Sequence, residues 1–503
     1  MSKPAIYVLG RNIRYMVFNK LVAFLVSFLL FPFIVRYTGQ EIYGVYLTVM
    51  TITGYFGLMD LGVMSALTKY VSEFKGRKDR KMINDIINAS FSFYVLIGII
   101  SSLLLFLLSK YFFLLFRIDR ENIETARQLF MVAGFSSIFT WPLNTFRGTI
   151  EGLNFWDVEA IVQIIIQVIN GITAYFIFSL GYGIVCFFII SQTQNILGSL
   201  TFYVFLRKKT GISISFPYLN RDTFRFILKF SIFMFLSSLM NIFFFQIHNI
   251  IIGYFISMSA VTVYAVANNI QNYFRTINST LGASPWTYAS EMEGRGDYEG
   301  QRVLLYKGTK FMSAIFVPIV LIMLFFSKPF ITYWMGPGFE ESILPARIVI
   351  VFWLFNGTME LAGGMLSAKG IVKEPLYIQI VMAILNVILA LSLIKYIGIT
   401  AVALGLTISM IFVGFPLYLK LSLKNLGITF KAYFNNAIKA NLTFYFFCVV
   451  VSSAAVTFFY PKNIHITFLE MGIIYTGLLV LYYSKFLNQN ERLEIKRLMG
   501  FSY

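Results

Sequence analysis

The sequence predicts an all-α polytopic membrane protein with about fourteen transmembrane helices. Of its 503 residues, 58% are hydrophobic and only 13% are charged, which is about half the charged fraction of a soluble domain. Apolar windows of roughly 20 residues, the length that crosses a bilayer, recur along the whole chain. Lys and Arg gather in alternate loops between these windows, as the positive-inside rule describes. These observations exclude a soluble fold.

The predicted spans use mainly Phe, Ile, Leu and Val with scattered Gly, Ser and Pro, a mixture that helical bundles in membranes tolerate. The first span follows a basic leader without a small-residue cleavage site, so we expect it to remain uncleaved. No long soluble domain fits between the spans. They begin near residues 13, 42, 83, 127, 158, 184, 229, 257, 309, 344, 376, 399, 440 and 467.

The basic residues predict the orientation of these spans. The chain has a net charge of +18, from 41 Lys and Arg against 23 Asp and Glu, and in a soluble protein this excess would indicate a nucleic-acid partner. With the N-terminus in the cytoplasm, 31 of the 41 basic residues fall in the leader, the inner loops and the tail. The excess therefore reflects topology and contact with anionic membrane lipids. We predict cytoplasmic N- and C-termini and no nucleic-acid partner.

The residues that carry most enzyme and metal chemistry are scarce. Cys186 and Cys448 cannot form a disulfide framework, and with His248 and His465 they offer too few ligands for a metal site. The sequence has no G-x-x-x-x-G-K-[ST] loop and no room for a soluble nucleotide-binding domain, which argues against ATP-driven pumping. We therefore expect no enzyme activity, no catalytic residues, no metal and no cofactor. The leading class is a secondary transporter, with H⁺ or Na⁺ as the coupling ion.

An internal repeat organises the chain. When the sequence is laid over itself with Lys69 opposite Thr287, KYVSEFKGRKDRK matches TYASEMEGRGDYE in a shared Y-x-S-E-x-x-G-R-x-D block. The same shift pairs Gly152 with Gly370. It moves the chain by six spans, an even number, so both copies of the block face the cytoplasm. The two halves are therefore predicted to be parallel repeats.

The repeat divides the chain into two six-helix lobes. We predict an N-terminal lobe at 1–206, a cytoplasmic linker at 207–228, a C-terminal lobe at 229–421, and two further spans with a cytoplasmic tail at 422–503. The repeated block is either a turn that ends a helix or a cytoplasmic gate whose charged residues pair across the lobes. The gate candidates are Glu73, Arg77, Asp79, Glu291, Arg295 and Asp297.

Polar residues recur at helical spacing inside several spans, where they must face a cavity or another helix. The longest stripe, in the span near 257, consists of Asn268, Gln271, Asn272, Arg275, Asn278 and Ser279. The shorter stripes are Ser237, Asn241 and His248; Gln163, Gln167 and Asn170; Ser191, Asn195 and Gly198; and Asn356, Glu360 and Gly364. Interhelical hydrogen bonds would explain any one stripe, whereas five stripes favour a hydrated central cavity. The candidate substrate contacts are Arg275, Lys20, Asn268, Gln271, Asn272 and Asn241.

Ionisable residues within the spans are expected to find partners, because a lone charge at the bilayer centre costs at least about 2.5–3.5 kcal/mol. Lys20 and Asp60 lie at similar predicted depth and are expected to pair, and so are Arg275 and Glu360. In the competing interpretation Arg275 binds an anion, since guanidinium holds phosphate oxygens in a bidentate fork. Asp60, Glu360 and His248 are the candidates for ion coupling, with pairing, capping and core packing as the alternatives.

Two stretches carry a family likeness. The run FPFIVRYTGQEIYGVYLTVMTITGYFGLMDLGVMSALTKYVSEF, from Phe31 to Phe74, resembles the first two helices of the bacterial polysaccharide flippases, which export O-antigen and capsule precursors. TFRGTIEGLNFWDVEA, from Thr145, resembles the loop after their fourth helix. The likeness is specific up to about residue 160. Beyond that point it rests on topology and duplication.

The resemblance implies a two-lobed antiporter in the bacterial cytoplasmic (inner) membrane. It would move an undecaprenyl-diphosphate-linked oligosaccharide to the outer leaflet by alternating access, for surface-polysaccharide or lipopolysaccharide biosynthesis. A polysaccharide polymerase and other assembly proteins are candidate partners. Three alternatives stay open: a lipid II flippase, whose Arg-rich first helix has only Arg14 and Lys20 here; a multidrug exporter, whose acidic residue near a proline has no counterpart beside Pro32; and a non-transporting scaffold.

Overall fold

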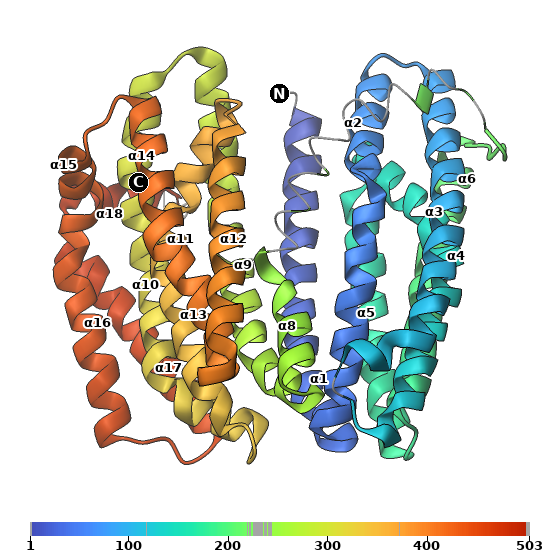
Figure 1. Ribbon diagram of the computed structural model, residues 1–503. Helices are drawn as coiled ribbons and strands as arrows, with labels where there is room; N and C mark the ends of the chain where they lie inside the picture. Colours follow the sequence, from blue (N-terminus) through green and yellow to red (C-terminus); the bar gives the residue numbers. More distant parts are fainter. Residues whose placement is uncertain are drawn as a thin grey trace. The chain divides into compact units, whose positions relative to one another are not determined.

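A computed structural model of the chain contains helices and their connecting turns, with no β-strand among the residues that it describes (Figure 1). The description covers residues 3–498 except 117, 219, 221–222, 225–234, 236–238, 240–243 and 372. Side chains are described for the same residues except 3–14, 76, 113, 115, 283–288, 290–291, 294 and 494–498. The prediction of an all-α polytopic membrane protein is confirmed.

The helices agree with the predicted spans. Among the described residues, eleven helical segments are long and apolar enough to cross a membrane. The first, Tyr15–Asp60, contains the predicted spans near 13 and 42, and α9 (Met258–Arg295) covers the predicted span near 257. The other ten segments each match one predicted span, with starts that differ by at most 11 residues, while the span near 229 lies largely outside the described residues. Starts differ most where a helix extends beyond its apolar window into a polar loop.

The chain forms two compact units, Met1–Thr262 and Val263–Tyr503. Unit 1 contains α1 (Lys3–Phe56), η1 (Gly57–Asp60), α2 (Val63–Gly76), α3 (Arg80–Leu115), η2 (Arg120–Asn122), α4 (Ile123–Gly152), α5 (Trp156–Ser179), α6 (Ile184–Thr210) and α8 (Ile247–Phe255). Helix α1 kinks at Gly39, whose φ of 78° suits glycine. Helix α3 packs along α4, α4 along α6, and α1 along α5. Burial of apolar side chains from α2, α3, α4 and α6 stabilises this unit.

The segment after α6, which begins the predicted linker, is bound along one face of α3. Three polar side chains of α3, spaced four residues apart and therefore on one helix face, bond to it. The bonds join Asn84 to Ser213 at 3.2 Å, Asn88 to Ser215 at 2.8 Å and Ser92 to Tyr218 at 2.9 Å. The first part of the linker is thus a packed element of unit 1.

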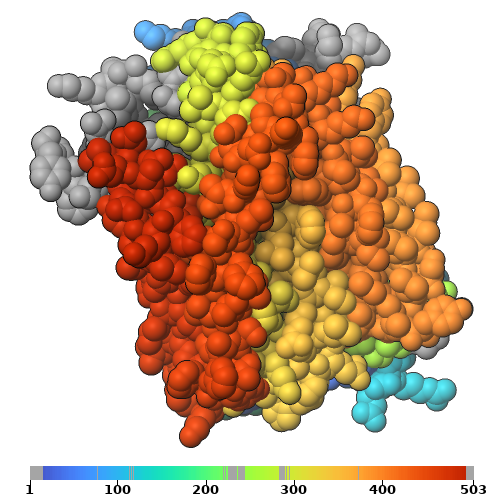
Figure 2. All heavy atoms as spheres, turned by 90° about the vertical axis from the view of Figure 1, so that its left-hand side faces the viewer, coloured from blue at the N-terminus to red at the C-terminus, as the bar shows by residue number. Residues whose placement is uncertain are grey.

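Unit 2 begins within α9 and continues through α10 (Tyr298–Met335), η3 (Glu340–Ser342), α11 (Ile343–Ala368), α12 (Lys373–Ile397), α13 (Thr400–Ser409), η4 (Met410–Gly414), α14 (Phe415–Leu426), α15 (Phe430–Tyr433), η5 (Phe434–Ile438), α16 (Lys439–Phe458), α17 (Ile464–Leu481), η6 (Tyr482–Phe486) and α18 (Gln489–Leu498). Helix α10 packs against α11, α16 and α17. Figure 2 shows α10, in yellow, between the red helices α16–α18 and the orange helices α12–α14. Helix α10 is therefore the central element of this unit.

Polar bonds fasten the C-terminal helices to α10. Lys310 on α10 forms an ion pair with Glu491 on α18 at 2.6 Å, and each side chain is only 12% exposed. Asn441 on α16 donates to the carbonyl oxygen of Lys310 at 2.7 Å and accepts from the Tyr482 hydroxyl at 3.0 Å. The two spans beyond the repeat are thus docked on a repeat helix by hydrogen bonds as well as by the apolar core.

The repeated block forms the same turn in both units. The turn between α2 and α3 contains Lys78 at φ 58°, and the turn between α9 and α10 contains its repeat counterpart, Gly296, at φ 69°. Asp79 then caps α3 by accepting from Met82 N at 3.0 Å, and Asp297 caps α10 by accepting from Gly300 N at 2.8 Å. The structure therefore supports the interpretation of this block as a helix-ending turn.

The duplication continues past the block, but with a different shift. The turn after α4 bonds Asn154 N to the oxygen of Glu151 at 3.0 Å, and the turn after α11 bonds Gly370 N to the oxygen of Ser367 at 3.0 Å. Asn154 and Gly370 both have positive φ, 63° and 72°, and occupy the same place in the two turns. The predicted match of Gly152 with Gly370 is therefore wrong by two residues, because α10 is two residues longer than α3 and α11 is four residues shorter than α4.

Candidate functional site

The polar stripe of α9 is divided between a buried edge and an exposed edge. Gln271 and Asn278 are buried, with 1% and 2% of their surfaces exposed, and the side-chain oxygen of each has no hydrogen-bond partner among the described residues. Asn272 and Arg275 are exposed, and Asn268 and Ser279 lie between these extremes. The stripe thus serves two purposes: one edge packs inside unit 2, and the other presents a cation and amides outward.

Glu360 lies against the buried edge. Its Oε2 accepts from Asn278 Nδ2 at 2.8 Å, which joins α11 to α9. The helices approach closely at Gly282, where a Cβ atom would lie 2.5 Å from Glu360 Cγ. The sequence placed Asn278 and Glu360 in separate stripes and did not predict this bond. The pair between Glu360 and Arg275 stays a prediction.

Arg275 restricts what the exposed edge of α9 can face. A charged side chain in hydrocarbon is costly, so the exposed edge of a membrane-embedded helix that carries Arg275, Asn272 and Asn268 should face water or protein rather than lipid tails. A guanidinium in such a place binds a diphosphate or carboxylate through paired N–H donors. The edge therefore has the chemistry of an anion-binding wall with amide donors and acceptors beside it.

Asp60 lies at a break in the second span of unit 1. Leu61 and Gly62 adopt positive φ, 47° and 79°, so the helix stops at η1 and restarts as α2. Asp60 Oδ1 accepts from Met64 N at 3.1 Å and from the hydroxyl of Tyr94. Lys20 is exposed, and within the part of the chain that the structure describes the side-chain partners of Asp60 do not include it. The predicted pair of Lys20 with Asp60 is therefore wrong, and Asp60 instead caps α2.

A second polar group joins α1, α5 and α6. Gln167 donates to Asn19 at 3.1 Å, and Gln194 donates to Thr173 at 2.8 Å. The side-chain oxygens of Gln167, Asn170 and Gln194 are buried without hydrogen-bond partners among the described residues. Interhelical bonding thus explains part of these stripes, and the remaining acceptors can take donors from water or from hydroxyl groups.

Of the candidate residues in the predicted span near 229, only His248 lies within the described residues. His248, on α8, is buried with 2% of its surface exposed, as expected of a core residue. Asn241 and Ser237 lie outside the described residues. Next to His248, Asn249 donates to Thr51 on α1 at 2.8 Å, a contact that the sequence did not indicate. Within the described residues, no group of three or more His, Cys, Asp or Glu side chains could hold a metal ion.

The gate candidates divide by role. Glu73 and Arg77 form an ion pair on α2 at 2.6 Å, and both are substantially exposed. Asp79 and Asp297 cap helices, Arg295 is exposed in the last turn of α9, and the side chain of Glu291 lies outside the described residues. Local roles therefore account for four of the six candidates, and pairing across the lobes stays a prediction.

Each unit also has a polar contact between its second repeat helix and the end of its fourth, and the sequence analysis did not identify either contact. In unit 1, Lys75 Nζ donates to the carbonyl oxygen of Leu153, and burial lowers the pKa of this lysine. In unit 2, Glu293 pairs with Lys369 at 3.2 Å and accepts from Gln301 at 2.8 Å. The bond from Gln301, followed by Lys369, lowers the pKa of Glu293. Lys75 and Glu293 occupy the same position in the repeated block. Charged residues at this shared position could have indicated the two contacts from the sequence.

Comparison with protein-family models matches two parts of the chain. Residues 9–283 match the model described as polysaccharide biosynthesis protein, and residues 234–392 match the model described as MatE. No curated protein sequence matches the chain.

Solved structures share the fold. One is an inward-facing multidrug resistance MATE family transporter of the MOP superfamily, with a TM-score of 0.69, 16% identity, and coverage of 81% of this chain and 95% of that chain. Another is the lipid II flippase MurJ in an inward closed conformation, with a TM-score of 0.69, 18% identity, and coverage of 93% and 99%. A MOP superfamily transporter from Pyrococcus furiosus has a TM-score of 0.59, 16% identity, and coverage of 84% and 96%. At these identities the likeness shows the fold alone, which is that of a MOP superfamily transporter.

Proposed function

The chain belongs to the polysaccharide biosynthesis protein family, and on that basis we propose that it is a lipid-linked oligosaccharide flippase. It would move an undecaprenyl-diphosphate-linked oligosaccharide across the bacterial cytoplasmic membrane for the synthesis of O-antigen, capsule or exopolysaccharide. The transporter fold and the non-enzymatic character of the family and of the structural neighbours support this class.

The observation that carries the proposal is the exposed edge of α9. Such a substrate combines a diphosphate, which needs a cation, with sugars, which need hydrogen-bond donors and acceptors. Arg275 supplies the cation, and Asn268 and Asn272 supply amides on the same edge. Gln271, although buried, keeps a side-chain oxygen that bonds to none of the described residues. Lys20, exposed on α1, is a second candidate cation, and Asn241 completes the proposed set.

The driving force is proposed to be an ion gradient. Moving one charge through 100 mV yields about 2.3 kcal/mol, which is enough to bias a cycle with a modest substrate gradient. Asp60 is the first candidate to bind H⁺ or Na⁺, because its carboxylate lies at a break in a membrane helix, and coupling ions in transporters bind at such breaks. Glu360 and His248 are the further candidates.

The test is depletion of the protein followed by analysis of the lipid-linked intermediates. The proposal expects one undecaprenyl-diphosphate-linked oligosaccharide to accumulate on the inner leaflet. Accumulation of lipid II would assign the chain to the lipid II flippases, and increased drug sensitivity without an intermediate would assign it to multidrug exporters. Unchanged intermediates together with lost polymer would indicate a scaffold. Reconstituted vesicles under imposed proton or sodium gradients then identify the ion, and indifference to both contradicts the coupling role.

A further inference from the structure

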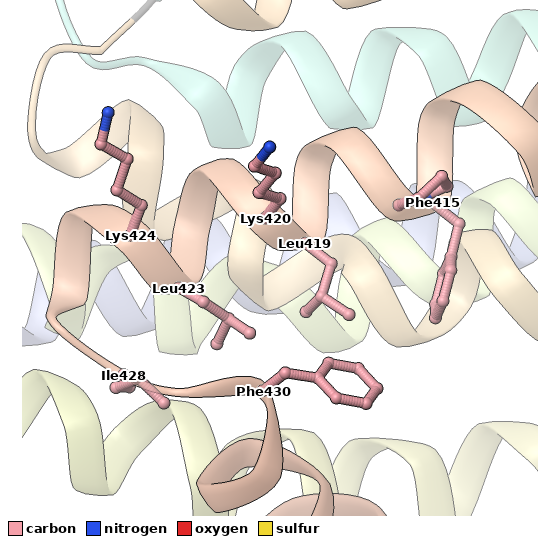
Figure 3. A pocket seen from close by; sticks show the side chains of 8 residues that line it. Phe415, Leu419, Lys420, Leu423, Lys424, Ile428 and Phe430 are labelled. Atoms are coloured by element: carbon pink, nitrogen blue, oxygen red, sulfur yellow. The ribbon is translucent and has the colours of Figure 1, made fainter.

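Unit 2 has an apolar groove between the end of α14 and the start of α15. Its volume is about 420 Å³. Figure 3 shows Leu419 and Leu423 on the side of α14 that faces Ile428 and Phe430, and Lys420 and Lys424 on the opposite side. Both lysines also border the groove and form one rim of it. Phe415 and Pro416 complete the lining. Among the described residues, the groove therefore has apolar walls, a lysine rim and no acidic side chain.

The segment of the chain that forms this groove carries charge of one sign. Between Glu374 and Glu470 the chain contains six lysines and no Asp or Glu. Lys424 lies in the last turn of α14, where it also complements the helix dipole. Lys420 lies a full turn earlier, so the helix end does not account for it. Both lysines are exposed, and the nearby Lys431 is exposed as well. An anionic ligand fits this rim.

The stretch of α14 that lines the groove is about as long as one leaflet of a bilayer is thick. From Phe415 to Lys424 the helix advances about 13 Å at 1.5 Å per residue, roughly half of a hydrocarbon core that is ~30 Å thick. The predicted orientation places the turn at Gly427 on the cytoplasmic side. Lysine stems can then lie along the apolar wall while their ammonium groups reach the head-group level.

We propose that this groove binds an anionic phospholipid of the inner leaflet. One acyl chain lies along Phe415, Leu419 and Leu423, and the phosphate is held by Lys420 and Lys424. The site does not rest on the proposed flippase function, because it requires only the bilayer that surrounds the protein. The bound lipid would lie where the repeat ends, next to the start of the C-terminal helices.

The test uses the full chain purified in phosphatidylcholine nanodiscs that contain increasing fractions of phosphatidylglycerol. A lipid that binds the folded state raises its thermal unfolding temperature, so the midpoint of this rise reports affinity. The double variant Lys420→Gln, Lys424→Gln is expected to need roughly 10- to 30-fold more phosphatidylglycerol, since each lysine near an anionic surface contributes about one kcal/mol. Soluble glycerol 3-phosphate is expected to have no effect.

A matched control removes the same charge elsewhere. Lys208→Gln, Lys209→Gln acts at the end of α6, where Lys208 is the counterpart of Lys424 under the shift that carries Asn154 onto Gly370, and is expected to leave the midpoint unchanged. The proposal is overturned if the wild type ignores phosphatidylglycerol, if the control shifts as far as the test variant, or if glycerol 3-phosphate alone reproduces the stabilisation. Displacement of phosphatidylglycerol by undecaprenyl phosphate in the wild type but not in the double variant would assign the groove to the substrate's tail and overturn it equally.

Discussion

The second helix of the repeat is broken in unit 1 and continuous in unit 2. In unit 1 it stops at Asp60, whereas in unit 2 the equivalent residue, Asn278, lies in the middle of α9. Gly57 and Gly62 flank the break, and the repeat places Arg275 and Thr280 at their positions in unit 2. Gly62 adopts a φ of 79° that suits glycine, and Thr280 is helical.

The difference changes the charge that each unit presents. Unit 1 has a carboxylate held by a backbone N–H and by Tyr94 at a helix break. Unit 2 has a neutral amide bonded to Glu360 and, one turn earlier, the exposed Arg275. The second repeat helix thus carries an acid at a helix break in unit 1 and an exposed guanidinium on a continuous helix in unit 2. Under the proposed function, Asp60 would serve ion coupling in unit 1 and Arg275 would serve substrate binding in unit 2.

The third repeat helix also differs between the units. A substitution that tests this difference is expected to have the largest effect on stability. Ser92 of α3 accepts a backbone N–H, while its counterpart Lys310 pairs with Glu491 in a buried site. Glu491→Gln leaves Lys310 buried without its counter-charge and should lower the free energy of unfolding by about 3–5 kcal/mol. Unfolding in mixed micelles measures it. Ser92→Ala should cost only about 1 kcal/mol, and equal costs would contradict the distinction.

The control for that measurement is Glu299→Gln. Glu299 is 76% exposed and pairs with Arg302 at 3.2 Å, so its loss should change stability by no more than about 1 kcal/mol. If Glu299→Gln lowered the free energy of unfolding as much as Glu491→Gln, the effect would not depend on burial of the ion pair.

A substitution of Arg275 tests the proposed substrate contact on α9. Arg275→Gln should reduce flipping of the lipid-linked oligosaccharide by roughly 10- to 100-fold, because hydrogen bonds to charged groups are worth about 1.5–3 kcal/mol. Accumulation of the inner-leaflet intermediate in complemented cells measures it. Arg120→Gln removes the same charge from an exposed loop of unit 1 and should leave flipping unchanged. Full activity of Arg275→Gln would remove α9 from the proposed site.

Substitutions at the helix break test whether its backbone conformation requires glycine. Gly62→Ala places a side chain at φ 79° and should destabilise unit 1 by about 1–2 kcal/mol. Gly57→Ala is the matched control, because a Cβ atom there meets nothing within 4 Å and alanine favours helix. Thr280→Gly in the continuous helix should cost about 1 kcal/mol or less. Thermal unfolding compares the three variants, and a neutral Gly62→Ala would mean that the break does not need its glycine.

The smallest effect concerns the polar contacts between the second and fourth helices. The folded pKa of Glu293 is lowered, so its stabilisation is present above the ordinary value of 4.5 and is lost as pH falls through the lower folded pKa. Glu293→Gln should therefore be less stable than the wild type at pH 7 by a fraction of a kcal/mol, as for ion pairs near a protein surface, and the difference should vanish in strong acid. Unfolding temperatures between pH 7 and pH 3 test this. A difference that grows on acidification would contradict it.

Much of the fold could be predicted from the sequence, and less of the site. Apolar windows located the spans because a bilayer imposes a length and a composition on each helix. The Y-x-S-E-x-x-G-R-x-D block located the repeat, and its Asp79 and Asp297 do occupy equivalent caps. The change of shift after the fourth helix was missed because an ungapped comparison cannot register a difference in helix length.

The sequence by itself determined the class of the protein, the predicted orientation of its helices and its duplication, because hydropathy, charge and repeats are properties of the chain read in order. The tertiary structure decided the partners. Asp60 bonds to Tyr94 rather than pairing with Lys20, and Asn278 bonds to Glu360. Residues at similar depth have several possible neighbours, and only the packing of helices determines which side chains come within bonding distance.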